Sequence, residues 1–213
     1  ALPSCRLSGH CLLHAPRRAE LDLRNPGALR QTMIRLQPDI VLNAAAYTAV
    51  DLAETEADAC YALNAEAVRE MASLCAAGGS LLIHISTDYV FDGTGQDPRR
   101  ESDACNPNNL YGRSKHLGEL LVEQGGCAHL ILRTAWLYQS GFPGFVRTML
   151  GLLARRTELQ VVADQIGHPS YAPDVADAAL RLLGSYAAAR PAGRKEMEGV
   201  YQDRKSVVEG KNV

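Results

Sequence analysis

A tyrosine and a lysine stand four residues apart in the stretch LYGRSKHLGE, which covers residues 110–119. Side chains four residues apart on an α-helix lie on the same face. A phenol has an ordinary pKa of about 10, and a neighbouring ammonium group lowers that pKa by favouring the phenolate. Tyr111 beside Lys115 could therefore donate or accept a proton near neutral pH.

A second polar cluster, STDY at residues 86–89, directly follows an apolar run. Ser, Thr and Asp also favour turns for local hydrogen-bonding reasons, so the cluster alone would indicate only the start of a loop. A Tyr and a Lys at this spacing also occur by chance in many helices. The combination is more specific, because the Thr87 hydroxyl could bind an oxygen that Tyr111 protonates.

Apolar runs alternate with helical patterns along the chain. The patterns predict strands over 10–15, 39–46, 80–86, 128–136 and 159–164, and helices over 25–37, 51–77, 109–124, 142–155 and 173–188. This alternation predicts an α/β fold, a doubly wound parallel sheet with helices on both faces. The near-continuous apolar run at 39–46 predicts a strand covered on both faces.

The chemistry-bearing stretches all follow predicted strands. NAAAYT, STDYVF and RTAWLY each come at the end of one strand, and ligands bind beyond the carboxyl ends of the strands in open parallel sheets. We therefore expect these three stretches to line one edge of the sheet. Asn25 before Pro26 is a good start signal for the helix at 25–37.

Composition excludes several classes of protein. The net charge of −2 offers no basic excess for nucleic acid, and no apolar run approaches the ~18–20 residues that cross a membrane. The six cysteines form no zinc-ligand pattern, so we expect reduced thiols, a cytoplasmic protein and no metal site. His84 alternates within a predicted buried strand, which favours a core residue over a ligand.

The chain resembles the extended short-chain dehydrogenase/reductases and, within them, the dTDP-4-dehydrorhamnose reductases. The stretches that carry the resemblance are LDLRNP, PDIVLNAAAYTAVDLAE, NA at 64–65, ISTDYVFDG, PNNLYGRSKHLGE, LRTAWLY and ADQIGHPSYAPDVA. The resemblance implies a Rossmann-like NAD(P)-binding fold. It also implies reduction of the C4 keto group of dTDP-4-dehydro-L-rhamnose to dTDP-L-rhamnose, with NADPH or NADH as cofactor.

The resemblance also implies roles for individual residues. Thr87, Tyr111 and Lys115 match the catalytic triad, in which Lys115 lowers the pKa of the phenol and holds the nicotinamide ribose. The matched cofactor-binding residues are Asp22, Leu23, Ala46, Tyr47, Thr48, Tyr111 and Lys115, and the matched substrate-binding residues are Thr87, Asp88, Tyr89 and Trp136. Structural alternatives stay open, with Asp22 ending a strand, Tyr47 packing on a helix and Trp136 filling the core.

The sequence departs from the family at both ends. It contains no GxxGxxG turn, the motif that holds the pyrophosphate, so we expect it to begin inside the following helix and the sheet to lack its first strand. No acidic residue ends the strand predicted over 10–15, which would be the second strand of the family's fold, and Arg17 and Arg18 follow it. This combination favours NADPH, although both could be ordinary surface arginines. A magnesium requirement cannot be read from the sequence.

These departures set the expected domains. We expect an incomplete NAD(P)-binding domain over 1–140, a partial substrate-binding lobe over 141–172, a helix over 173–190 that packs back on the first domain, and a non-native tail over 202–213. Two alternative functions stay open: another nucleotide-sugar reductase or epimerase, and a regulatory subunit like that of methionine adenosyltransferase. The resemblance is also compatible with a homodimer of the full-length protein.

Overall fold

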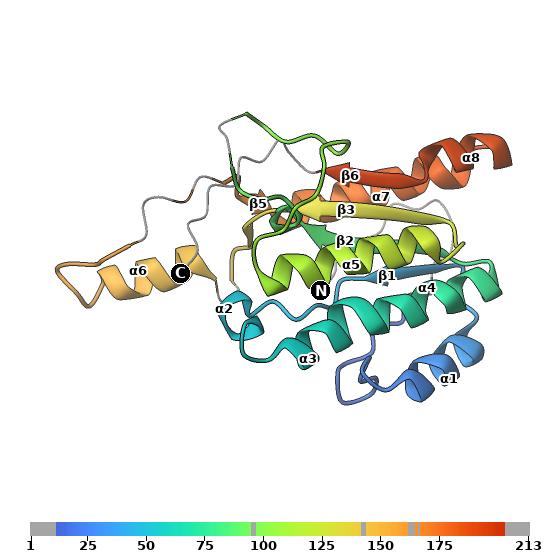
Figure 1. Cartoon of the computed structure of the whole chain (residues 1–213), viewed down its shortest axis with the longest axis horizontal. Helices are drawn as coiled ribbons and strands as arrows, with labels where there is room; N and C mark the ends of the chain where they lie inside the picture. The colour runs from blue at the N-terminus through green and yellow to red at the C-terminus, as the bar shows by residue number, and fades with distance from the viewer. Residues whose placement is uncertain (1–11, 95–96, 142–143, 162–164, 166, 203–213) are drawn as a thin grey trace.

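A four-stranded parallel sheet forms the centre of the computed structural model, which describes residues 12–94, 97–141, 144–161, 165 and 167–202 (Figure 1). Its strand order is β1-β2-β3-β6, with β1 at Ile40–Asn43, β2 at Leu81–Thr87, β3 at His129–Thr134 and β6 at Gly199–Gln202. Each neighbouring pair is parallel, and Leu82 on β2 lies opposite His129 on β3. The predicted parallel α/β fold is confirmed.

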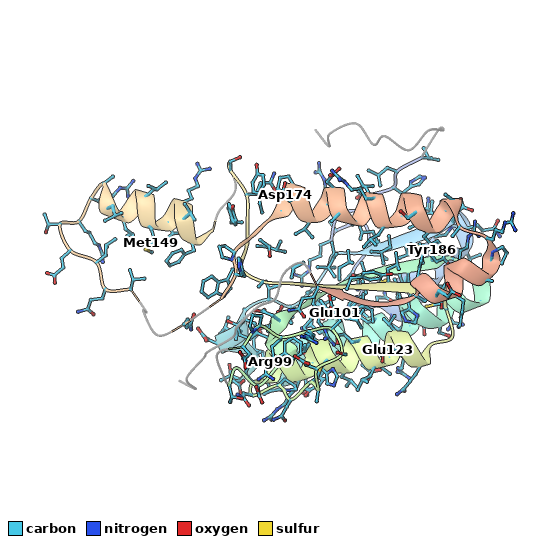
Figure 2. All side chains as sticks on the ribbon, turned by 90° about the horizontal axis from the view of Figure 1, so that it is seen from above. Arg99, Glu101, Glu123, Met149, Asp174 and Tyr186 are labelled. Carbon is cyan, nitrogen blue, oxygen red and sulfur yellow. The ribbon has the colours of Figure 1, made fainter. Side chains whose placement is uncertain are left out.

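Helices cover both faces of this sheet. Helices α4 (Ala67–Gly78) and α5 (Leu110–Gln124) lie on one face and α7 (Ala172–Ala188) lies on the other (Figures 1 and 2). Side chains of β2 pack on both faces of the sheet because successive residues point to opposite sides. Leu82 packs in a cluster with α4 and α5, whereas Leu81 and Ile83 pack in a cluster with α7. The sheet is thus doubly wound.

Local signals place the ends of three helices. The Asn25 side chain accepts from the backbone N–H of Ala28 (3.1 Å) and begins α1 (Pro26–Leu36) as predicted. Asn109 caps α5 in the same way, accepting from the N–H of Gly112 at 2.7 Å. Gly79 caps the C-terminal end of α4, and its φ of +70° is a conformation that glycine adopts without strain.

The single helix predicted over 51–77 is wrong, because the chain turns after Ala53. The segment divides into α2 (Val50–Ala53), α3 (Ala57–Tyr61), a π-helical turn η1 (Ala62–Glu66) and α4. At the break, the Glu54 carboxylate accepts from the N–H of Leu110, at 2.7 Å. The Thr55 hydroxyl donates to the Leu52 carbonyl at the end of α2. The break therefore ties this segment to the start of α5, a contact that helical periodicity does not reveal.

Two strand predictions at the start of the chain also need correction. Residues 12–15 form no strand, and Leu12 and Leu13 are exposed; residues 10 and 11 lie outside the described part. The run at 39–46 gives only the four residues of β1, of which Ile40 and Leu42 are exposed. Among the described residues no strand pairs with the outer edge of β1, and the cluster under α7 contains no β1 side chain. Within the described residues, one face of β1 is therefore uncovered.

The second half of the chain adds shorter elements. They are η2 (Asp88–Val90, a 3₁₀ turn), β4 (Leu137–Tyr138), α6 (Phe145–Leu153), β5 (Ser170–Tyr171) and α8 (Pro191–Met197), with β4 and β5 forming a separate parallel pair. Residues 159–161 form no strand, and 162–164 of that prediction lie outside the described residues, as do 203–213 of the expected tail. Gln202, the first residue of that expected tail, instead ends strand β6.

Two expectations from composition can be compared with the described residues. Cys60 and Cys75 are fully buried, and the described cysteines are free thiols. None of the described helices combines the length and the apolar character that a membrane span requires.

Candidate active site

Thr87 and Tyr111 meet at the carboxyl end of the sheet. Thr87 is the last residue of β2, and Tyr111 lies in the first turn of α5. The Thr87 hydroxyl lies near enough to the Tyr111 phenol to lower its pKa. Lys115 lies one turn further along the same helix, which runs across one face of the sheet (Figure 1). The structure thus brings the predicted triad together from two adjacent elements.

Tyr111 is enclosed by apolar and aromatic neighbours. It packs with Ala53 and Cys60, and the ring of Tyr89 meets its ring edge-on with centroids 5.5 Å apart. Burial raises the pKa of Tyr111 to about 12, although the Thr87 hydrogen bond acts in the opposite direction. The pKa thus lies above the ordinary value of a phenol, and the lowering expected from Lys115 is not seen in this structure. The phenol is held protonated and suits a proton donor.

The Lys115 amine is directed at the backbone of β2. Only 1% of this residue is exposed, and Nζ donates to the Ile85 carbonyl at 2.7 Å and lies 3.3 Å from Nε2 of His84. Burial lowers the pKa of Lys115 to about 8, against a smaller opposing effect of Glu119. The amine is therefore more easily deprotonated than an exposed lysine.

Asp88 and Tyr89 form the turn η2 next to Thr87. The Thr87 hydroxyl donates to Oδ1 of Asp88 (3.2 Å) and accepts from the N–H of Tyr89 (3.2 Å). The Asp88 carboxyl is almost completely buried, and this burial raises its pKa to about 6. The turn thus places a weakened acid and an aromatic ring beside Thr87 and Tyr111.

The loop after β1 borders the same site. The N–H of Tyr47 donates to Oδ1 of Asn64 (2.8 Å), and its hydroxyl donates to the Glu56 carboxylate (2.7 Å). That hydrogen bond to Glu56 is the main reason why the pKa of Tyr47 rises to about 12. Its ring packs against the Ala53, Cys60 and Tyr111 cluster. Ala46 and Thr48 flank it, so the loop predicted to contact the cofactor adjoins the triad.

Asp22 and Leu23 lie apart from the triad. Asp22 forms an ion pair with Arg24 (2.6 Å), which lowers the pKa of its carboxyl to about 2. Leu23 packs against the core cluster between the sheet and helices α1 and α4. Neither residue has a described interaction with the triad, and the packing alternative fits Leu23.

Trp136 is not a core residue. It is 43% exposed and follows β3 by two residues, and the last residue of β3, Thr134, lies opposite Thr87. Its φ of +42° lies in the left-handed region that L-residues rarely adopt. A Cβ added to Gly167 would come within 2.7 Å of the indole ring, so a glycine is needed where that segment crosses the ring. Trp136 therefore stands exposed at the same sheet edge as Thr87.

Sequence reasoning missed two residues that support the site. Asn64 donates from Nδ2 to the Ser114 hydroxyl (2.9 Å) and to the Tyr47 carbonyl (3.1 Å), and Ser114 donates to the Tyr111 carbonyl (2.7 Å). Asn64 lies in the π-helical turn η1, and such turns often occur at functional sites. The sequence did indicate Asn64 in one way, since it belongs to the NA stretch at 64–65 that helps carry the family resemblance. Asn64 joins the loop after β1 to helix α5.

One cluster has the ligand types of a metal site. Ligand atoms of Cys105, His116 and Glu119 lie within 4.8 Å of one another. However, the Arg133 guanidinium donates to both carboxylate oxygens of Glu119, at 2.9 and 2.7 Å, and to Sγ of Cys105, at 3.2 Å. Because a cationic group already occupies the cluster, these residues do not fit a metal ion.

The residues at the sheet edge fit the nicotinamide end of a dinucleotide. A protonated phenol and a buried amine lie on α5, and the loop after β1 opens with the exposed small residues Ala44 and Ala45. Small side chains at a strand end let a ligand approach the backbone. The GxxGxxG turn that would hold a pyrophosphate is not in the sequence. The fit therefore covers the reactive end of such a cofactor.

Comparison with known proteins gives consistent matches. The family model described as the RmlD substrate binding domain matches residues 5–202. A dTDP-4-dehydrorhamnose reductase of Burkholderia thailandensis is 44% identical over 176 residues, which are 83% of this chain and 59% of the relative. The chain therefore spans about three fifths of that relative's length.

Solved structures agree with these sequence matches. A dTDP-4-dehydrorhamnose reductase of Bacillus anthracis in complex with NADP superposes with a TM-score of 0.73 at 34% identity, covering 90% of this chain and 66% of that one. A dTDP-4-dehydrorhamnose reductase from Clostridium acetobutylicum superposes with a TM-score of 0.79 at 34% identity, covering 88% and 63% of the two chains.

Proposed function

The chain belongs to the RmlD substrate binding domain family, and on that premise we propose that its protein reduces the C4 keto group of dTDP-4-dehydro-L-rhamnose to give dTDP-L-rhamnose. The observation that carries the proposal is the meeting of Thr87 and Tyr111 at the carboxyl end of β2, with Lys115 one helical turn away. The B. thailandensis relative and the B. anthracis structure named for this reductase support the substrate.

Tyr111 and Thr87 would have separate roles in this carbonyl reduction. A reduced nicotinamide, when bound, supplies the hydride that the carbonyl carbon receives. Tyr111 gives its phenolic proton to the carbonyl oxygen, so the C=O bond becomes a C–OH group. Thr87, whose hydroxyl donates to Asp88 in this structure, would turn that proton to the same oxygen as negative charge develops on it. The proton is available on Tyr111 because burial keeps the phenol neutral at physiological pH.

NADP(H) is the cofactor we propose, since the B. anthracis structure holds NADP. Lys115 would hold the nicotinamide ribose, and the loop of Ala46, Tyr47 and Thr48 would pass along the cofactor. Asp88, Tyr89 and Trp136 would contact the sugar. The cytoplasm as location and a homodimer of the full-length protein belong to the same proposal.

The domain division is also part of the proposal. Residues 1–140 would form the cofactor domain, and 173–190 would pack on it through α7, as Ala179 and Leu183 do against β2 and β3. Residues 141–172 would belong to a substrate lobe. Helix α6 has no buried residue and projects away from the sheet, as the position of Met149 shows (Figure 2).

The test mixes the protein with NADPH and dTDP-4-dehydrorhamnose and follows the absorbance of the dihydronicotinamide. We expect NADPH to be consumed, and we expect Tyr111→Phe to slow the reaction ~10²–10⁴-fold, because it removes a general acid. Tyr186→Phe, which changes a tyrosine on α7 far from β2's carboxyl end, is the matched control and should keep the rate (Figure 2). An epimerase would show no net consumption, and full activity of Tyr111→Phe would refute the assigned acid.

A further inference from the structure

The bend that follows α2 carries an exposed glutamate that reaches the start of α5. Oε1 of Glu54 accepts from the backbone N–H of Leu110 at 2.7 Å, although the two residues lie 56 positions apart in the sequence. Leu110 is the first residue of α5 and directly precedes Tyr111. A single exposed hydrogen bond contributes only modestly to the stability of a fold. The place of this contact, next to the proton donor, is therefore its most informative property.

The N–H of Leu110 has no acceptor within its own helix. The first four N–H groups of an α-helix lack intrahelical partners. The Asn109 side chain accepts from the N–H of Gly112 (2.7 Å), and the Asn109 carbonyl accepts from the N–H of Arg113. Glu54 supplies the acceptor for Leu110 from a different segment, at the end of the helix where the dipole favours a carboxylate. The first turn of α5 is thus held both by its own cap and by Glu54.

The elements around Glu54 also touch the turn that carries Tyr111. Ala53, which precedes Glu54, is fully buried and packs in one cluster with Tyr111. Turn η2 lies equally close, since a Cβ added to Gly112 would come within 2.2 Å of the Tyr89 carbonyl oxygen. The first turn of α5 is therefore in direct contact with both α2 and η2, which leaves little room for Tyr111 to move.

The bend that carries Glu54 is itself anchored. The Thr55 hydroxyl donates to the Leu52 carbonyl (3.1 Å), and the Glu56 carboxylate accepts from the Tyr47 hydroxyl (2.7 Å). Glu54 therefore projects from a segment tied to the loop after β1. An acceptor on such an anchored segment can define where the start of α5 lies.

We propose that Glu54 is a positioning residue for Tyr111: by accepting from the N–H of Leu110 it fixes the first turn of α5, and with it the place of the phenol relative to Thr87. The reach of the acceptor oxygen is what matters for this role. Proton transfer requires the donor at hydrogen-bond distance, so a small displacement of the phenol slows it strongly. The catalytic consequence rests on the proposed reductase function, whereas the contact with Leu110 can be measured without turnover.

Two variants separate the reach of Glu54 from its charge. Glu54→Gln keeps the length and an acceptor oxygen but loses the charge, whereas Glu54→Asp keeps the charge on a side chain one methylene shorter. Glu54 is exposed, so both variants should fold. The matched control is Glu70→Asp, which shortens a glutamate whose carboxylate accepts from Arg30 (2.7 Å) across 40 positions of the sequence.

The first measurement follows the structure without turnover. The exchange of the Leu110 amide proton with solvent, measured by NMR, should be slow in the unmodified protein, in Glu54→Gln and in Glu70→Asp. In Glu54→Asp we expect it to be ~10-fold faster, because the acceptor is withdrawn. The nuclear Overhauser contacts between the rings of Tyr89 and Tyr111 should weaken in the same variant. Unchanged exchange and unchanged ring contacts in Glu54→Asp would overturn the proposal.

The second measurement follows NADPH consumption and separates kcat from KM. We expect Glu54→Asp to lower kcat ~10-fold while both KM values stay within about twofold, because the donor and not the binding of the substrates is displaced. Glu54→Gln and Glu70→Asp should retain kcat. A merely structural contact would shift the urea midpoint and leave kcat unchanged.

The two proposals fail in different ways. Full kcat in Glu54→Asp, or a Glu54→Gln protein as slow as Glu54→Asp, would contradict the positioning role. If the unmodified protein consumes no NADPH, the proposed reductase function is wrong, and the Leu110 exchange and the ring contacts still decide whether Glu54 places Tyr111.

Discussion

The two hydroxyls of the site differ in what their surroundings allow. Tyr111 is buried beside Tyr89, which keeps its proton on the phenol, whereas the Thr87 hydroxyl donates to Asp88 and accepts from the N–H of Tyr89. A proton donor needs only to hold its proton until charge develops. A threonine contributes differently, by presenting a hydrogen bond at a fixed position, which is most valuable where water is excluded.

Thr87→Val tests that fixed hydrogen bond. Valine has nearly the shape of threonine, so the end of β2 should persist while the donor is lost. We expect NADPH consumption to fall ~10²–10³-fold, the usual effect of removing one donor from a developing oxyanion. The matched control is Thr94→Val in an exposed loop, which should retain the rate. A Thr87→Val protein with an unchanged rate would show that Thr87 does not contact the reacting oxygen.

At the level of the elements, local signals predicted the starts and ends of helices well. Asn25, Asn109 and Gly79 act within one helical turn, so the sequence alone is enough to place α1, α5 and the end of α4. The grouping of Thr87, Tyr111 and Lys115 could also be predicted, because Thr87 ends a strand and the other two residues lie near the start of a helix.

Contacts between distant segments explain what the sequence did not predict. A hydrogen bond from Leu110 to Glu54 accompanies the helix break after Ala53. The exposure of Ile40 and Leu42 on β1 likewise depends on which other segments pack against that strand. His84 was correctly predicted to be a buried core residue. Its contact with Lys115 joins β2 to α5, which no local pattern indicates.

The ion pair of Arg133 and Glu119 joins β3 to α5 and should be important for stability. Both side chains are almost fully buried, and Arg133 also lies over the ring of Phe91, 5.2 Å from its centroid. Glu119→Gln would leave the guanidinium without its anion, so we expect a loss of ~3–5 kcal/mol in the free energy of unfolding. Urea denaturation measures this difference.

The matched control for this prediction is Glu123→Gln. Glu123 is exposed on the same helix, so its variant should stay within about 0.5 kcal/mol of the unmodified protein. Replacing both charged partners, as in Glu119→Leu with Arg133→Met, should recover much of the loss because no unpaired charge stays buried. If Glu119→Gln is as stable as Glu123→Gln, the pair does not stabilise the junction of β3 and α5.

For the whole molecule, the buried titratable groups determine how stability depends on acid. The pKa of His84 is lowered from 6.5 to about 3, so its contribution is lost as the pH falls from about 6.5 to 3. The pKa of Glu119 is lowered from 4.5 to about 2, mainly by the Arg133 hydrogen bonds acting against burial, so its contribution is lost below about pH 4.5. Asp88 acts in the opposite direction. Its pKa is raised from 3.8 to about 6, so the folded protein gains stability as the pH falls through that interval.

These opposite signs predict a plateau followed by a steep decline. Between about pH 6.5 and 4.5 the effects of His84 and Asp88 largely cancel, and below about pH 4.5 the loss from Glu119 joins that from His84. Asp88→Asn removes the compensating group, so the decline should begin near pH 6.5 instead of 4.5. Urea midpoints measured across this pH range would show the shift, with Asp58→Asn, at an exposed carboxyl on α3, as the matched control. The same onset in Asp88→Asn and the unmodified protein would mean that the Asp88 carboxyl does not take up its proton on folding.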